Sequence, residues 1–167
     1  MERMAMLQRD GRWERGNNMS PALQAAAKAG RLQATLPGKP RLPFVLVVDD
    51  EANFTRRLKM ALEAAGFDAA AALDGEAALA QVAIRVPDLI VLDVMMPGMD
   101  GISCLRALRA RLGPSDPPVI LVTGYGGTAV EVAGLVYNVA GIVRKPCTFQ
   151  DVIDVAKRTL FPGSSPE

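Results

Sequence analysis

The sequence predicts an α/β fold in which a doubly wound, five-stranded parallel sheet carries helices on both faces. Two observations lead to this prediction. Apolar runs of strand length alternate with longer segments of helical periodicity, five of each, beginning at Phe44. Most of the apolar runs show no polar alternation, which is typical of strands that are buried on both faces.

Five segments have the character of strands. The first, at 44–48, is wholly apolar, whereas the second, at 67–72, is weaker and is predicted mainly from its place in the series. The other three are bounded by Pro or Gly, and they are 89–94, 117–124 and 141–146.

Five further segments are predicted to be helical. The first, at 51–66, carries its large apolar side chains on one face and is expected to end at Gly66. The last, at 148–160, opens with a capping box of Thr148 and Asp151. The three helices between them are 75–85, 102–112 and 128–140. Because crossover connections of this kind are right-handed, the most economical sheet has the flavodoxin-like order 2-1-3-4-5, whose ligands bind at the carboxyl ends of the strands.

The chain is expected to divide into a basic, Pro-rich extension at 1–42, a folded domain at 43–161 and a tail at 162–167. The extension holds eight Lys and Arg against three Asp and Glu, and the remaining residues reverse this balance. We expect the extension to be mobile, with a short helix near 20–33; a docking role for it is the alternative.

Composition argues against several classes of function. Histidine is absent, which removes His-based triads, most zinc sites and autophosphorylation on histidine. Cys104 and Cys147 show no metal-ligand or redox spacing, and they favour a cytoplasmic protein. The sequence has neither a membrane-spanning run nor a signal-peptide core, so no membrane partner is expected. The basic extension carries five net positive charges but only one aromatic residue, Trp13, which does not favour nucleic-acid binding.

Polar residues stand at the ends of four predicted strands. In a parallel sheet these ends share one edge, so their side chains are expected to meet in one pocket. Clustered acids without histidine or thiolate favour Mg²⁺, and a lysine among them offers a point charge for a phosphoryl oxygen. The residues are Asp49 and Asp50 after the first strand, Asp93 at the third, Thr123 at the fourth and Lys145 at the fifth.

Each of these residues also has a purely structural explanation. Asp49 and Asp50 could cap the following helix, where acids are favoured. Thr123 could be an ordinary strand residue and Lys145 a solvated charge, and the segment PGMDG could serve only as a turn. Independent caps and turns have no reason to converge on one pocket, so the set as a whole favours a functional site.

The motifs VLVVDDE, DLIVLDVMMPGMDG, VILVTG and VRKP, in this order and spacing, resemble the receiver domain of bacterial response regulators. The resemblance implies that Asp93 accepts a phosphoryl group from a histidine kinase or a histidine phosphotransfer protein, in a reaction that depends on Mg²⁺. It implies that Asp50, Asp93 and the main-chain carbonyl of Met95 bind the ion, while Asp49 orients a metal-bound water. Lys145 would pair with the acceptor carboxylate and then with the phosphoryl group.

The implied function is two-component or phosphorelay signalling by a phosphoprotein, not enzymatic turnover. Thr123 would hydrogen-bond the phosphoryl group on aspartylphosphate 93 and thereby switch contacts with a downstream protein effector. A pseudo-receiver that is never phosphorylated and acts as a protein-binding module is the alternative. A phosphatase of the aspartate-nucleophile class would need a second acid where this chain has Met95.

Two features depart from the common pattern. Many receivers have an aromatic residue three positions before the lysine, where this chain has Ile142. The predicted helix 128–140 carries a single charge, Glu131, so it is expected to expose apolar side chains. We predict that this helix, together with 141–146 and 148–160, forms a face for homodimerisation or effector docking; a helix merely rich in small residues is the alternative. Only seven residues follow the last predicted helix, so a stand-alone receiver is expected.

Overall fold

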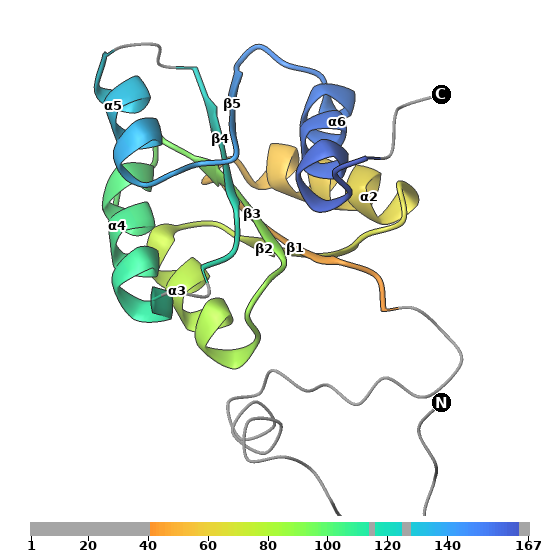
Figure 1. Cartoon of the computed structure of the whole chain (residues 1–167), viewed down its shortest axis with the longest axis horizontal. Helices are drawn as coiled ribbons and strands as arrows, with labels where there is room; N and C mark the ends of the chain where they lie inside the picture. Colours follow the sequence, from red (N-terminus) through yellow and green to blue (C-terminus); the bar gives the residue numbers. More distant parts are fainter. Residues whose placement is uncertain (1–40, 114–115, 125–127, 164–167) are drawn as a thin grey trace, which may run out of the picture. The chain divides into compact units, whose positions relative to one another are not determined.

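The computed structural model describes residues 41–113, 116–124 and 128–163. Within these ranges five strands form one parallel sheet in the order β2-β1-β3-β4-β5, which confirms the predicted fold class and strand order (Figure 1). The strands are β1 (Phe44–Val48), β2 (Asp68–Ala72), β3 (Leu89–Asp93), β4 (Val119–Thr123) and β5 (Gly141–Arg144). The helices are α2 (Ala52–Ala64), α3 (Gly75–Ile84), α4 (Gly101–Leu112), α5 (Thr128–Val136) and α6 (Phe149–Leu160).

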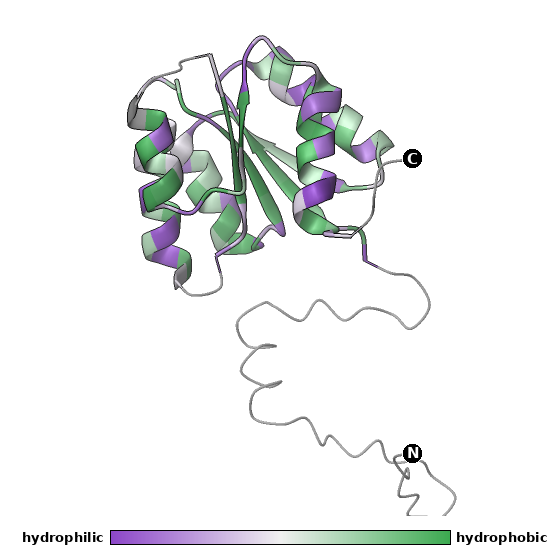
Figure 2. Ribbon diagram, turned by 45° about the horizontal axis from the view of Figure 1, so that its top comes forward, coloured by the Kyte–Doolittle hydropathy of each residue, from purple (hydrophilic) through white to green (hydrophobic). Residues whose placement is uncertain are grey.

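Helices cover both faces of the sheet. Helices α3, α4 and α5 lie over one face and α2 and α6 over the other (Figure 1). Successive side chains of a strand point to opposite faces, so Leu46 and Leu121 join the apolar cluster on the first face while Val47 and Ile120 join the cluster on the second. The strands are therefore apolar throughout, as Figure 2 shows, and polar side chains are confined to their ends.

Two helix caps predicted from the sequence are present, one at the start of α6 and one at the end of α2. In the reciprocal capping box of α6, the Thr148 side chain accepts from the Asp151 N–H and the Asp151 side chain accepts from the Thr148 N–H. Helix α2 ends just before Gly66, whose φ of 93° is a left-handed conformation that glycine adopts without steric cost. Both signals were readable from the sequence.

Two elements near the end of the chain are shorter than predicted. The helix predicted at 128–140 ends at Val136, because Asn138 adopts a left-handed conformation with φ of 50° and turns the chain toward β5. The strand predicted at 141–146 ends at Arg144, because Pro146 has no N–H to donate to a neighbouring strand. The Lys145–Pro146 peptide bond is cis.

The predicted extension, including the helix near 20–33, lies outside the described residues except for Arg41 and Leu42. The Arg41 guanidinium donates to both carboxylate oxygens of Asp88, at 2.6 and 2.7 Å, and Asp88 also accepts from the Phe44 N–H. The chain is thus anchored where β1 begins, while the boundaries at 42/43 and 161/162 stay predictions. In the described part of the chain, no helix combines the length and apolar character needed to cross a bilayer.

Candidate functional site

The carboxyl ends of β1, β3 and β4 meet at one edge of the sheet, and the predicted site residues lie there. Asp49 and Asp50 follow β1 directly, Asp93 is the last residue of β3, and Thr123 is the last residue of β4. Asp49, Asp93 and Thr123 are buried, whereas Asp50 is exposed. The edge therefore combines buried acids with one acid that solvent reaches.

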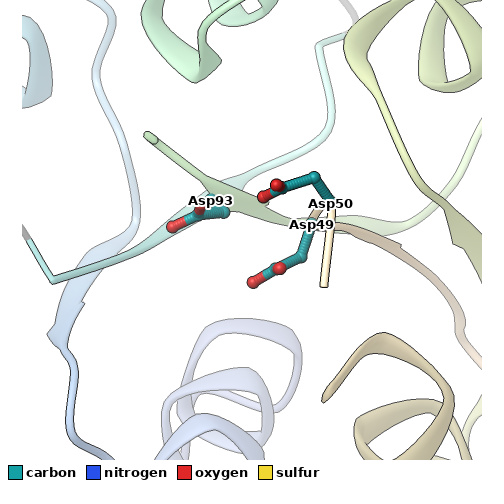
Figure 3. A group of neighbouring side chains, drawn as sticks. All are labelled: Asp49, Asp50 and Asp93. Carbon is teal, nitrogen blue, oxygen red and sulfur yellow. The ribbon is translucent and has the colours of Figure 1, made fainter. Parts of the chain in front are cut away.

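Three carboxylates form a compact cluster at this edge. Asp49, Asp50 and Asp93 each present an oxygen within 4.8 Å of the oxygens of the other two, and Figure 3 shows the three side chains gathered together. The buried Oδ1 of Asp93 makes no hydrogen bond with the described residues, and its charged partner is the Lys145 ammonium at 3.4 Å. Carboxylate oxygens held this closely fit a hard divalent cation such as Mg²⁺.

Lys145 approaches the cluster from β5. Its Nζ lies 2.6 Å from Oδ2 of Asp49 and 3.4 Å from Oδ1 of Asp93. The Lys145 main-chain N–H donates to the carbonyl of Thr123 at 2.8 Å, which fixes the residue after β5 beside the end of β4. The structure thus brings Asp49, Asp50, Asp93 and Lys145 together, with Thr123 adjoining them through the main chain.

Asp49 also contributes to the start of α2, which is part of the capping role that its position allows. Its Oδ1 accepts from the N–H of Glu51 at 2.9 Å, just before α2, while its Oδ2 accepts from Lys145. Asp50 makes no such contact in the described part of the structure and remains open toward solvent. Capping and site chemistry therefore use different oxygens of the same carboxylate.

Burial and neighbouring charges perturb the central ion pair. Desolvation by burial raises the pKa of Asp93, and the Asp49 carboxylate adds to this effect, although Lys145 opposes it. For Lys145, burial disfavours the ammonium, but the hydrogen bond and charge of Asp49 and the charge of Asp93 outweigh it, so the pKa is raised. Asp93 therefore carries its negative charge at a cost in stability, whereas Lys145 is held as a cation.

We expect the Asp93→Asn variant to be more stable than the wild type at pH 7 by on the order of 1 kcal/mol, because it removes a buried charge. The folded-state pKa of Asp93 lies above its ordinary value of 3.8, so ionisation opposes folding. Below a pH of 3.8 Asp93 is protonated in both the folded and the unfolded chain, so it does not lower the free energy of unfolding. As the pH rises through the folded-state pKa, ionisation of Asp93 lowers the stability of the wild type relative to the Asn variant. Urea unfolding in buffer free of divalent cations should show the gain at pH 7 and little gain near pH 4; a gain that is the same at both pH values would contradict the assignment.

The loop after Asp93 returns to the site through the start of α4. Asp100 caps α4 by accepting from the N–H of Ser103 at 2.8 Å, and the N–H of Gly101 donates to the carbonyl of Val94 at 2.9 Å. A Cβ on Gly101 would lie only 2.0 Å from the carbonyl oxygen of Asp93. The segment PGMDG therefore forms a turn, and Gly101 within it also lets α4 approach the main chain that carries Asp93.

Two residues that contact the site were not predicted from the sequence, Thr55 and Phe54. The buried hydroxyl of Thr55 lies 2.9 Å from the carbonyl oxygens of both Asp49 and Glu51, which ties the first turn of α2 to the end of β1. The ring of Phe54 lies 4.7 Å from Nζ of Lys145, measured to the ring centroid. The contact of Thr55 could have been suspected from the sequence, because this polar residue lies on the same helical face as Leu58. Nothing in the sequence indicates the contact of Phe54 with Lys145.

Met95 and Ile142 occupy the two remaining positions of interest. Met95 is exposed two residues beyond Asp93. Ile142 is partly exposed, and its Cδ1 lies 3.3 Å from the position that a Cβ on Gly134 of α5 would take. Ile142 therefore packs toward α5, and the aromatic ring near Lys145 comes from α2 instead.

Comparisons with known proteins agree with this arrangement. The family model for the response regulator receiver domain matches residues 45–157. Response regulator PleD of Caulobacter vibrioides is 42% identical over 103 residues, which are 61% of this chain and 22% of PleD. Chemotaxis protein CheY4 of Vibrio cholerae is 27% identical with a TM-score of 0.67 over 71% of this chain and 99% of that chain. The receiver domain of Francisella response regulator 1452 is 34% identical with a TM-score of 0.62, covering 70% and 98% of the two chains.

These similarities concern one domain. The chain spans less than half the length of the curated relatives that it resembles, among them PleD. The family match nevertheless covers more than half of this chain, and it coincides with the sheet and helices described above. The chain belongs to the response regulator receiver domain family of two-component signalling.

Proposed function

We propose that Asp93 is the phosphoacceptor of this receiver domain and takes its phosphoryl group from a phosphohistidine on a histidine kinase or a histidine phosphotransfer protein. A carboxylate oxygen of Asp93 forms a bond to phosphorus while the phosphorus–nitrogen bond breaks, and the imidazole nitrogen keeps the electron pair and takes up a proton. The observation that carries the proposal is the buried Asp93 carboxylate, 3.4 Å from the Lys145 ammonium and clustered with two further acids.

The acid cluster fits the magnesium ion that the family implies. Asp50, Asp93 and the main-chain carbonyl of Met95 would hold Mg²⁺, with Asp49 orienting a metal-bound water. The Asp93 carboxylate, whose Oδ1 makes no hydrogen bond with the described residues, and the exposed Asp50 support this assignment, since both can supply oxygen ligands. When bound, the ion supplies positive charge that offsets the charge of the phosphoryl oxygens.

Lys145 and Thr123 would stabilise the transferred group. The raised pKa of Lys145 keeps its ammonium charged, and its contact with Asp93 places that charge where negative phosphoryl oxygens arrive. Thr123, at the end of β4, would donate its hydroxyl to one of these oxygens. The resulting acyl phosphate would alter contacts with a downstream protein, so the site serves as a signalling switch rather than a turnover enzyme.

Incubation of the full chain with acetyl phosphate and Mg²⁺ tests the proposal. We expect intact-mass spectrometry to show the mass of one phosphoryl group on the wild type and none on Asp93→Asn or after chelation of Mg²⁺. Asp154→Asn, which changes an acid on α6, is the matched control and should be modified like the wild type. An unmodified wild type would instead favour a pseudo-receiver that acts as a protein-binding module.

We also propose that the face formed by α5, β5 and α6 mediates homodimerisation or effector docking. Leu135 is 84% exposed and Val136 67% exposed on α5, and Ile142 of β5 is partly exposed with its Cδ1 close to Gly134 of α5. Exposed apolar side chains on one face often mark a site of protein association. The Glu131–Arg144 ion pair at 3.0 Å links α5 to β5 across this face.

Leu135→Lys is expected to weaken self-association of the phosphorylated chain by about tenfold or more, because it replaces an exposed apolar side chain of this face with a charge. Sedimentation velocity at several concentrations measures the effect. Ile84→Lys changes an equally exposed residue at the end of α3 and is the control, so it should leave self-association unchanged. Equal behaviour of the two variants would contradict the assignment of this face.

A further inference from the structure

We propose that Phe54 is a positioning residue for Lys145, whose ring holds the ammonium at the point where a phosphoryl oxygen of modified Asp93 would arrive. The inference rests on the proposed function of Asp93 as phosphoacceptor. It concerns a contact between α2 and the residue after β5, which the chain's motifs do not contain.

Three groups surround the Lys145 ammonium. Asp49 lies 2.6 Å away, Asp93 lies 3.4 Å away, and the centroid of the Phe54 ring lies 4.7 Å away. A cation within about 6 Å of a ring centroid is attracted by the negative face of the ring, and the attraction is stronger where water is partly excluded. Lys145 is partly buried, so this condition is met.

The ring acts on an ammonium that its two carboxylate partners hold unequally. The lysine ammonium is a point charge on a flexible four-carbon stem, and two carboxylates alone leave it free to favour the closer one. Asp49 is the closer partner, and a tight pair with Asp49 would keep the ammonium away from Asp93. A neutral ring attracts the cation without competing for its hydrogen bonds, so it holds the ammonium near the site while a new oxygen replaces a carboxylate.

Phe54 is itself fixed in place. It stands in the first turn of α2, which the hydroxyl of Thr55 ties to the main chain of Asp49 and Glu51. Its ring packs on the ring of Phe149 with centroids 5.5 Å apart and an interplanar angle of 57°. The ring that faces the ammonium is therefore supported by both helices on this side of the sheet.

A double-mutant cycle on the full chain tests the inference. We expect Phe54→Leu to slow phosphorylation by acetyl phosphate and Mg²⁺ by about three- to tenfold, the range that a cation–π contact implies. In a Lys145→Gln background the same substitution should have no further effect, because the group on which the ring acts is gone. Phe54→Tyr keeps the ring and should restore the wild-type rate within about twofold.

Phe149→Leu is the matched control, because it removes a ring from the same aromatic pair without facing the lysine. Any effect of this control should be the same in the wild-type and Lys145→Gln backgrounds, as for a general packing defect. If Phe54→Leu also slowed both backgrounds equally, or slowed neither, the positioning role would be overturned. Circular dichroism of each variant verifies that the fold is retained, and Phe54→Met provides a second ring-free variant.

A measurement independent of phosphorylation separates this inference from the proposed function. In the wild type, the ring current of Phe54 should shift the ε-methylene proton resonances of Lys145 upfield, and Phe54→Leu should abolish the shift. Absence of the shift in the wild type would overturn the inference even if Asp93 is phosphorylated. Modification that persists in Asp93→Asn would overturn the proposed function while the shift still reports the Phe54–Lys145 contact.

Discussion

The Gly101→Ala variant is expected to lose about 2–4 kcal/mol of its free energy of unfolding, measured by urea denaturation. Helix propensity alone predicts the opposite sign, since alanine is favoured over glycine in a helix by about 1 kcal/mol. The reversal comes from contact with main-chain atoms. A Cβ on Gly101 would lie 2.0 Å from the carbonyl oxygen of Asp93 and 2.7 Å from Cα of Val94, so α4 or the end of β3 must move.

Gly98→Ala is the control for this prediction. Gly98 has a φ of 77°, but a Cβ on it would meet no atom within 4 Å. Its replacement should cost only the conformational penalty of a left-handed residue, about 1–2 kcal/mol. Because the Gly101 contact involves the main chain of Asp93, Gly101→Ala should also slow phosphorylation more than Gly98→Ala does. If the two variants lost the same stability and were phosphorylated at the same rate, the steric explanation would be contradicted.

The Lys145→Gln variant is expected to accept phosphate from acetyl phosphate about 100-fold more slowly than the wild type, with Mg²⁺ saturating. The substitution removes the cation that lies 3.4 Å from Asp93 and leaves the charge of the phosphoryl oxygens less well balanced. The rate is measured by mass spectrometry over a time course. Lys157→Gln, an exposed position on α6, is the control and should react at the wild-type rate.

Lys145→Gln should also reduce stability at neutral pH by about 1–3 kcal/mol, because it leaves the buried Asp49 carboxylate without its charged partner. Added Mg²⁺ should recover part of this loss by supplying positive charge to the same cluster. A variant that reacts at the wild-type rate and keeps its stability would show that Lys145 is a solvated surface charge.

The sheet and the position of the site were predictable because local pattern and topology agree. The wholly apolar runs at 44–48 and 89–92 are strands buried on both faces, as their lack of alternation indicates. Once such strands are parallel and adjacent, their polar ends must meet at one edge. Asp49 and Asp93 could therefore be placed in one cluster without coordinates.

The contacts that arise from tertiary approach were not predictable. The closeness of Gly101 to Asp93 depends on how α4 docks on β3, and the same sequence motif is also compatible with an ordinary turn. The ring of Phe54 reaches Lys145 because the start of α2 and the residue after β5 lie at the same edge of the sheet, and the contact itself is encoded by no local pattern. The early end of α5 follows from the conformation of Asn138, a residue type that also occurs inside helices.

The unfavourable ionisation of Asp93 has an evolutionary consequence. Under the phosphoacceptor role proposed for Asp93, its replacement by Asn would abolish phosphorylation, and we expect the same change to stabilise the fold. Selection for stability alone would therefore favour Asn over Asp at this position, and the resulting protein could no longer be phosphorylated there. At the end of β3, the proposed signalling role and the stability of the fold therefore favour different residues, and the proposed role would account for an aspartate there.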